Sequence, residues 1–213
     1  MSSLDSTTIA RLLQPYAAVN AGQIEYISRY INILLKWNAR INLTAVREPT
    51  EIVTRHFGES LFLAEYLIGP DCRSTVADLG SGAGFPGVPL AIWAPQTKVT
   101  LIESNGKKAA FLNEVIHQLE LSNVTVFSRH AEDYLEKSEL VTMRAVEKFK
   151  GVLPIAAELM ASNGRLSLMI GANQVEMAKA DLSSLVWSSP VAVPGGHSRV
   201  LLVGTKVVQV GQT

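Results

Sequence analysis

The chain has 213 residues, with 19 lysines and arginines against 19 aspartates and glutamates and a single cysteine. Hydrophobic residues make up 47% and charged residues 18%, a composition that excludes intrinsic disorder and can fill a sizeable core. The net charge of zero excludes long-range attraction to nucleic acid, so a nucleic-acid partner would have to bind a local patch. Cys72 has no second cysteine to pair with, which predicts a reducing, cytoplasmic location.

The N-terminal region does not have the pattern of a signal peptide, because Asp5 is acidic and no cationic segment precedes an apolar stretch. The uncharged window from Leu79 to Thr97 is long enough to cross a bilayer. It contains four glycines and three prolines, however, which a membrane helix would not carry together. We therefore expect a functional loop and a short helix there, and no membrane partner. We also expect a monomer that binds no metal.

The first 71 residues predict a helical extension that packs on the rest of the chain. Apolar side chains recur at intervals of three and four residues from Ile24 to Leu35, the spacing of one helix face. That helix is expected to end near Trp37. A shorter helix is expected over residues 8–19, and a third from Pro49 to the Gly69-Pro70 pair.

From residue 72 to residue 213, short apolar runs alternate with helical stretches. Strands are expected at Thr75–Leu79, Lys98–Glu103, Val124–Phe127, Leu140–Met143 and Arg165–Ile170, and helices at Val88–Ala94, Gly106–Leu121, Glu132–Lys137 and Phe149–Ser162. This alternation predicts an α/β domain with a doubly wound, mostly parallel sheet. Two further runs, Leu185–Val193 and Ser198–Val203, are joined across Pro194-Gly195-Gly196 and predict a C-terminal antiparallel hairpin.

The strongest local signal is a glycine-rich turn between the first strand and the helix after it. Its glycines let the backbone bend tightly and approach a ligand, and the helix start offers free N–H groups. Two patterns overlap in this turn. Gly82, Gly84 and Gly87 spell the G-x-G-x-x-G of dinucleotide-binding folds. Taken with Asp78, the glycines at 80, 82 and 84 spell D-x-G-x-G-x-G, which is similar to motif I of class I S-adenosylmethionine-dependent methyltransferases.

The acid after the second strand fits both patterns, because Glu103 would hold ribose hydroxyls in either fold. The C-terminal hairpin favours the methyltransferase, and so does the lack of a following substrate domain in this sequence. Asp78 would then lie opposite the cationic methionine moiety. A glycine turn that binds no ligand is the third alternative.

Further segments make the resemblance specific. They are Lys36-Trp37-Asn38, Asn42 to Arg47, Arg55-His56, Asp78 to Pro89, Glu103-Ser104, Gly106-Lys107-Lys108 and Phe111-Leu112. In this order they closely resemble the bacterial 16S ribosomal RNA guanine-N7 methyltransferases, also called glucose-inhibited division protein B. Generic methyltransferases lack the two prolines of the segment 84–90. The resemblance implies S-adenosylmethionine as cofactor and, as substrate, a guanine of 16S rRNA, either free, in an assembly intermediate or in the small subunit.

The resemblance and the glycine pattern together assign roles to individual residues. The expected cofactor-binding residues are Asp78, Gly80, Ser81, Gly82, Phe85, Glu103, Ser104, Ala131, Glu132 and Arg144. Among them, Ala131 and Glu132 match the pair beside the adenine, and Arg144 matches an arginine near the reacting methyl group and is the expected catalytic residue. Phe85 could instead plug the following helix against the sheet, and Glu132 could be an ordinary first-turn acid.

The expected substrate-binding residues are Asn38, Asn42, Arg55, His56 and His130. As an alternative, Asn38 and Asn42 could hydrogen-bond the irregular backbone after the second helix. His56 is better explained as a packed or hydrogen-bonded histidine than as a catalytic base. The segment 24–57 carries five lysines and arginines against three acids, an excess that fits either phosphate contacts or a solvated face.

Methylation at guanine N7 needs no general base, because N7 has a lone pair and no proton to remove. The reaction needs alignment, exclusion of water and tolerance of the positive charge that develops on the base. Met143 to Val146 stand where an exocyclic-amine methyltransferase has an Asn/Asp-Pro-Pro-aromatic motif, which disfavours that chemistry. Cys72 precedes the first strand, which excludes a cysteine-nucleophile mechanism.

Two positions depart from the family pattern. His130 stands where the family usually has arginine, and Ile170 where it usually has lysine. Both missing groups are cations suited to phosphate or base contacts. Two alternative functions therefore stay open: a divergent methyltransferase acting on another RNA or a small molecule, and a nucleotide-binding module without catalysis.

Overall fold

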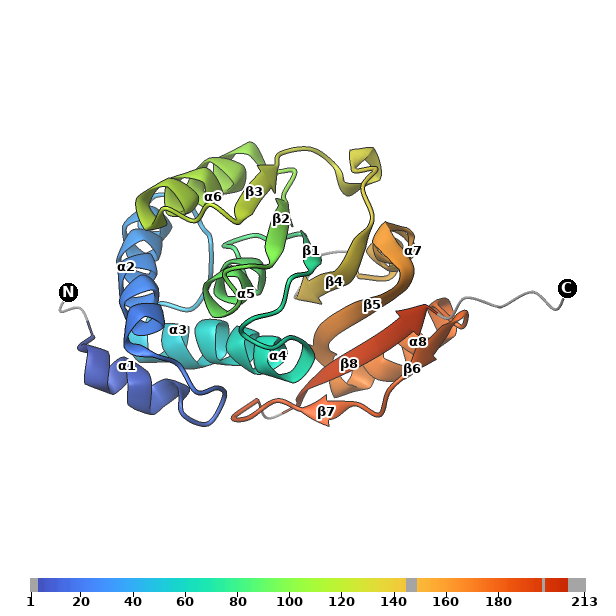
Figure 1. Cartoon of the computed structure of the whole chain (residues 1–213), viewed down its shortest axis with the longest axis horizontal. Coiled ribbons are helices and arrows are strands. Elements are labelled where there is room, and N and C mark those ends of the chain that lie inside the picture. Colours follow the sequence, from blue (N-terminus) through green and yellow to red (C-terminus); the bar gives the residue numbers. More distant parts are fainter. Residues whose placement is uncertain (1–3, 145–148, 197, 207–213) are drawn as a thin grey trace, which may run out of the picture.

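The structure is a computed structural model and describes residues 4–144, 149–196 and 198–206 (Figure 1). An eight-stranded sheet runs through it in the order β3-β2-β1-β4-β5-β8-β6, with β7 paired to β8 off this path. The strands are β1 Thr75–Leu79, β2 Lys98–Ile102, β3 Val124–Phe127, β4 Ser138–Arg144, β5 Met160–Gly171, β6 Leu185–Trp187, β7 Val191–Ala192 and β8 Arg199–Lys206. Strands β1 to β5 are parallel, and β8 runs antiparallel to β5, β6 and β7. The predicted mostly parallel sheet with a C-terminal antiparallel hairpin is confirmed.

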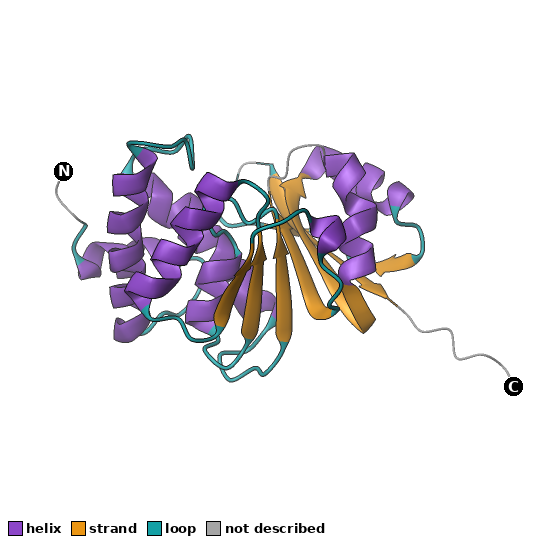
Figure 2. Ribbon diagram, turned by 90° about the horizontal axis from the view of Figure 1, so that it is seen from above, coloured by secondary structure: helices purple, strands orange, loops and turns teal. Residues whose placement is uncertain are grey.

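Helices cover both faces of this sheet, as Figure 2 shows. The helices α5 Gly87–Trp93 and α6 Gly106–Leu119 share one apolar cluster with the N-terminal helices, and α7 Phe149–Leu159 and α8 Val175–Asp181 belong to a second. Successive residues of a strand point to opposite faces. Val76 of β1 accordingly lies in the first cluster and its neighbour Ala77 in the second.

The N-terminal extension consists of α1 Ser6–Leu13, α2 Ala21–Asn38 and one long helical segment. That segment contains α3 Pro49–Ile52, a π-helical turn at Val53–Gly58 and α4 Glu59–Leu67. The indole N–H of Trp93 in α5 donates to the Ile68 carbonyl at the end of α4, at 3.1 Å. The extension is therefore tied directly to the helices of the sheet, and the boundary predicted near residue 72 falls in the connection from α4 to β1.

The predicted helix at Glu132–Lys137 is wrong. Only a short 3-10 turn forms there, at Ala131–Asp133. The ring of Tyr134 packs edge-on against Phe127 at a centroid distance of 5.1 Å, and its hydroxyl lies 3.3 Å from the Thr100 hydroxyl. These tertiary contacts hold the segment against β2 and β3, and they override a helix propensity that is weak over so few residues.

Three features of the secondary structure also differ from expectation. The first helix ends at Leu13 rather than near residue 19, because Pro15 has no N–H to continue the helical hydrogen bonds and its ring clashes with the carbonyl four residues earlier. The first arm of the hairpin is divided into β6 and β7 around Pro190, which has no N–H to give to a strand pair. Helix α8 was not predicted. Among the described residues, no helix has the length and apolar character to cross a membrane.

Candidate functional site

A cavity of about 540 Å³ opens at the carboxyl ends of β1, β2 and β4. Its lining comes from the turn after β1, the turn after β2, the end of β4 and the N-terminal extension: Leu43, Thr44, His56, Gly80, Ser81, Gly82, Ala83, Phe85, Glu103, Ser104, Asn105, Lys108 and Arg144. Strands β2 and β3 are added on one side of β1, and β4 and β5 on the other, so the order of the strands reverses between β1 and β4. Ligands of open α/β sheets bind at such a switch point, outside the carboxyl ends of the strands.

The glycine turn leaves the cavity open at one residue and packs tightly at two others. Gly82 has a φ of +58°, and a Cβ placed there would meet no atom closer than 3.8 Å. A Cβ at Gly84 would instead collide with the Tyr30 hydroxyl, and one at Gly87 with the side chains of Leu101 and Asp78. Gly82 therefore presents bare backbone to the cavity, whereas Gly84 and Gly87 permit close packing behind it.

Glu103 is the fixed acid of the cavity. Its side chain follows β2 and the residue is only 7% exposed. One carboxylate oxygen accepts the Gly82 N–H at 2.9 Å, and the other accepts the Asn105 N–H at 2.8 Å. A carboxylate has about four acceptor positions, so two backbone bonds orient Glu103 and leave it able to accept further hydrogen bonds from a ligand. Ser104 and Asn105 continue the wall beside it.

Asp78 does not line the cavity, in contrast to the expected contact with a methionine moiety. The residue is 1% exposed, and its carboxylate accepts the Thr142 hydroxyl at 2.8 Å and the Gly87 N–H at 3.1 Å. Burial raises the pKa of Asp78 to about 6, and the hydrogen bonds from Thr142 and Gly87 oppose that rise. The Ser81 hydroxyl donates to the Asp78 carbonyl at 2.8 Å. Asp78 thus holds the glycine turn against β4 and α5 from behind.

Phe85 is the middle of a stack of three rings. Its ring lies parallel to Tyr30 at 5.4 Å and to His56 at 4.8 Å, between centroids, and Phe57 meets it edge-on at 5.1 Å. The Tyr30 hydroxyl donates to the Ala83 carbonyl of the glycine turn. Phe85 therefore joins the turn to α2 and to the π-helical turn, and it also forms part of the cavity wall.

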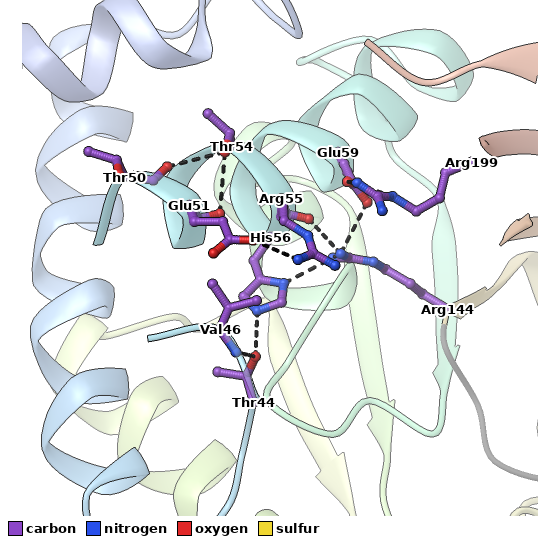
Figure 3. Close-up of polar contacts among 10 residues, drawn as sticks. All are labelled: Thr44, Val46, Thr50, Glu51, Thr54, Arg55, His56, Glu59, Arg144 and Arg199. Carbon is purple, nitrogen blue, oxygen red and sulfur yellow. Dashed lines mark hydrogen bonds and ion pairs between the residues drawn. The ribbon is translucent and has the colours of Figure 1, made fainter. Parts of the chain in front are cut away.

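His56 is held as a neutral ring. Burial is the main cause that lowers its pKa to about 3, and the nearby charges of Arg144, Arg55 and Arg199 lower it further. Its Nδ1 faces Nη2 of Arg144 at 3.4 Å and its Nε2 faces the Thr44 hydroxyl at 2.7 Å (Figure 3). A guanidinium only donates, so Nδ1 accepts and the ring proton is on Nε2, donating to Thr44.

Arg144 ends β4 and reaches from the cavity wall to the long N-terminal helix (Figure 3). Its Nη2 donates to the Arg55 carbonyl and lies 3.1 Å from a carboxylate oxygen of Glu59. The other oxygen of Glu59 lies 2.5 Å from Nη2 of Arg199 and 2.8 Å from its Nε. Burial lowers the pKa of Arg144, and Glu59 opposes that effect. These partners and the His56 ring all lie at Nη2, whereas the buried Nη1 has no hydrogen-bond partner among the described residues.

Three of the expected substrate-binding residues do not line the main cavity. Asn38 is 5% exposed, and its side chain bonds the Thr44 carbonyl at 3.0 Å and the N–H groups of Leu43 and Thr44 at 2.9 and 3.0 Å. Its polar atoms thus hold the loop after α2, and a substrate contact of Asn38 stays a prediction. Asn42 is exposed outside the main cavity. Arg55 directs its side chain to Glu51 at 2.6 Å.

The residues after β3 lie apart from the cavity. His130 and Glu132 are exposed, Ala131 is half-buried, and none of the three is in the lining. Ile170, at the second position that departs from the family pattern, is 5% exposed in the apolar cluster of α7 and α8. The structure therefore brings together Gly80, Ser81, Gly82, Phe85, Glu103, Ser104, His56 and Arg144, but not the predicted adenine pair.

Comparison with known proteins places the chain in a family. The family model for rRNA small subunit methyltransferase G matches residues 23–195, well over half of the chain. The chain belongs to this family. A relative, Ribosomal RNA small subunit methyltransferase G of Xylella fastidiosa strain M23, is 47% identical over 145 residues. Its counterpart in Xanthomonas euvesicatoria pv. vesicatoria is 44% identical over the same length. Each match covers 67% of this chain and 66% of the relative, so it spans just under two thirds of the relatives' length.

Solved structures share the fold of this family member. An S-adenosylmethionine-dependent methyltransferase from Aquifex aeolicus matches with a TM-score of 0.61 at 17% identity, over 75% of this chain and 94% of that one. TYW2 of P. horikoshii in complex with MeSAdo matches with a TM-score of 0.59 at 17% identity, over 72% and 63%. These likenesses concern the fold alone, and they confirm the predicted methyltransferase fold class.

For this member of the methyltransferase G family, sequence reasoning missed several residues of the site. Thr44 and Lys108 line the cavity. In the sequence they belong to segments that resemble the family, but neither was predicted as a site residue. Lys108 was detectable in principle, since it lies in the first turn of α6, the helix that follows β2. Glu59 carried no signal, because an acid in a predicted amphipathic helix is usually solvated; here the residue is 1% exposed.

Proposed function

We propose that the protein is an S-adenosylmethionine-dependent enzyme that methylates N7 of a guanine in 16S ribosomal RNA. The membership in the methyltransferase G family supports the reaction and the substrate class. The observation that carries the cofactor assignment is Glu103, a buried carboxylate fixed by two backbone N–H groups at the switch point of the sheet.

The residues around the cavity fit S-adenosylmethionine. Glu103 would accept its ribose hydroxyls, because both carboxylate oxygens retain free acceptor positions beside the Gly82 and Asn105 bonds. The bare backbone at Gly82 would let the turn approach the ligand closely. A volume of about 540 Å³ lies within the range of small-molecule sites. When bound, the cofactor supplies an electrophilic methyl group on a cationic sulfur.

The cavity offers alignment and shielding rather than a base. His56 is neutral with a pKa of about 3, and its ring is fixed by Thr44 and Arg144 and by stacking on Phe85. A group that holds protons so weakly is a poor proton acceptor at neutral pH. Guanine N7 has no proton to lose, so a fixed ring that does not take up protons suits this reaction. Cys72, which precedes the amino end of β1, is at the opposite end of that strand from the cavity.

Cations beside the cavity mouth are suited to the phosphates of RNA. Arg40, Lys107 and Lys108 line a hollow that shares Asn105 and Lys108 with the main cavity. Lys36 and Arg40 line a further hollow along α2 and α6. Within the described ranges these four side chains form no ion pair. A chain with no net charge would bind RNA through such a local patch.

The proposal extends to the partner and the place of action. A ribosomal substrate implies a cytoplasmic enzyme, and we propose that a monomer acts on the small subunit or an assembly intermediate. No cluster of potential metal ligands occurs in the part of the chain that the structure describes, and the proposed displacement needs none.

Titration calorimetry with S-adenosylmethionine and, separately, with NAD tests the cofactor. Binding of S-adenosylmethionine supports the proposal, and binding of NAD alone would overturn it. Transfer of a labelled methyl group to small subunits from a strain that lacks the enzyme then tests the substrate. Cofactor binding without any transfer to small subunits or their RNA would favour the second candidate, a methyltransferase with another substrate. His130 and Ile170, which stand where the family usually has arginine and lysine, motivate this candidate.

A further inference from the structure

Glu59 is a buried acid shared by two arginines from distant parts of the chain. Its side chain is 1% exposed and contacts Arg144 at 3.1 Å and Arg199 at 2.5 Å. Arg144 ends β4 at the cavity, Arg199 begins β8 of the C-terminal hairpin, and Glu59 begins α4. The three residues join the N-terminal extension, the centre of the sheet and the hairpin at one point (Figure 3).

We propose that Glu59 is a positioning residue, which holds the Arg144 guanidinium in place at the cavity and is itself held by Arg199. The inference rests on the proposed methyltransferase function, in which Arg144 is the side chain nearest in role to the reacting methyl group. Glu59 has no place in the lining, so it would act only through Arg144.

The π-helical turn before Glu59 brings three partners of Arg144 together on one helix. The Arg55 carbonyl, the His56 ring and the Glu59 carboxylate all face the same guanidinium nitrogen, Nη2 (Figure 3). Widened turns of this kind are rare and occur frequently at functional sites. The helix therefore offers a backbone acceptor, a ring nitrogen and a carboxylate at one position, and a misplaced arginine would lose all three.

The charges of the cluster indicate that Glu59 positions Arg144 rather than only stabilising the fold. A buried ion pair contributes little net stability, because the desolvation of both charges offsets their attraction. Here one carboxylate faces two guanidinium groups, so the cluster keeps one excess positive charge next to the cavity. Without Glu59, both guanidinium groups would repel each other and a cationic ligand. Glu59 thus sets both where Arg144 lies and how much positive charge the cavity wall carries.

The test compares Glu59→Gln with Glu65→Gln, the same substitution at an exposed residue of the same helix. The quantities are kcat and KM for small subunits, per molecule of enzyme competent to bind S-adenosylmethionine. We expect kcat to fall about 10- to 100-fold in Glu59→Gln, because small misplacements of reacting groups have effects of this size. KM for the subunit should change less than about threefold, because the rim cations are untouched. An unchanged kcat would overturn the proposal.

A second readout needs no substrate. Nitrogen-15 NMR of labelled histidine reports which ring nitrogen of His56 carries the proton. The wild type and Glu65→Gln should show the proton on Nε2, and Glu59→Gln should lose this single form because Arg144 no longer faces Nδ1. Retention of the wild-type form in Glu59→Gln would also overturn the proposal. If the ring changes as expected while the wild type transfers no methyl group to small subunits, the proposed function fails and the positioning role stands.

Should Glu59→Gln not fold, Arg199→Gln applies the same test from the other side. Arg199 is partly exposed, so its replacement leaves Glu59 paired with Arg144 but free to move. We expect kcat to fall by about three- to tenfold with an unchanged subunit KM. An unaltered kcat in this variant would contradict the role of the hairpin in holding Glu59.

Discussion

Replacing Glu103 with glutamine should weaken S-adenosylmethionine binding more than its similar shape suggests. Both carboxylate oxygens accept backbone N–H groups, at 2.9 Å from Gly82 and 2.8 Å from Asn105. A glutamine amide has one oxygen, so its NH₂ group would face one of these N–H donors and leave it without an acceptor. That loss costs about 1–3 kcal/mol, and a lost hydrogen bond from a ribose hydroxyl to the charged group adds about 1.5–3 kcal/mol.

Because part of this cost falls on the free protein, we expect a net loss in binding of about 2–4 kcal/mol, or roughly 30- to 700-fold in Kd. Calorimetric titration of wild type and Glu103→Gln measures it. The matched control is Glu139→Gln, since Glu139 also accepts a backbone N–H, from Thr75 at 3.0 Å, but lies at the amino ends of the strands. A Kd for Glu103→Gln within threefold of the wild type would refute the assignment of Glu103 as the ribose-binding acid.

Three further predictions concern charge and pH. Lys107→Ala with Lys108→Ala should weaken rRNA binding and lower the slope of log K against log salt by about 2, whereas Lys98→Ala, at the other end of β2, should not. The pKa of His56 is about 3 in the folded protein, below its ordinary value of 6.5. Between these two values the unfolded chain binds a proton that the folded protein does not bind, so stability falls as pH falls from 6.5 toward 3. His56→Gln should remove about 2 kcal/mol of the destabilisation seen in urea titrations between pH 7 and pH 5. The pKa of Asp78 is raised from 3.8 to about 6, so its contribution is lost as pH rises, and Asp78→Asn should remove a decline of about 2 kcal/mol between pH 4 and pH 7. A wild-type salt slope in the double lysine variant, or wild-type pH dependence in either other variant, would contradict the corresponding assignment.

The glycine turn and Glu103 could be predicted because their signals are local. A strand, a glycine-rich turn and a helix follow one another within 20 residues, and the acid ends the next strand. The carboxyl ends of neighbouring parallel strands meet at one edge, so the pattern alone places Glu103 beside Gly82. Asp78 shows the limit of such reasoning. Its spacing marks the motif, but only the packing of Thr142 and Gly87 shows that its carboxylate is enclosed behind the turn.

The charge cluster could not be predicted, because Glu59, Arg144 and Arg199 are 55 or more residues apart in sequence. Their meeting depends on where the N-terminal helix crosses the sheet and on the position of β8 next to β5. Asn38 is the opposite case, in which the contacts that the structure shows are local in sequence. Its partners at Leu43 and Thr44 lie within six residues, and an asparagine after a helix commonly bonds nearby backbone. The structure shows these backbone contacts, and a substrate contact of Asn38 stays a prediction.

The most direct measurement is a map of modified nucleosides in 16S rRNA from a strain that lacks this protein, before and after its gene is restored. Primer extension and mass spectrometry locate N7-methylguanosine in such RNA. The proposed function predicts that one N7-methylguanosine is missing in the deletion strain and returns with the wild-type gene but not with Glu103→Gln. An unchanged map in the deletion strain would contradict it.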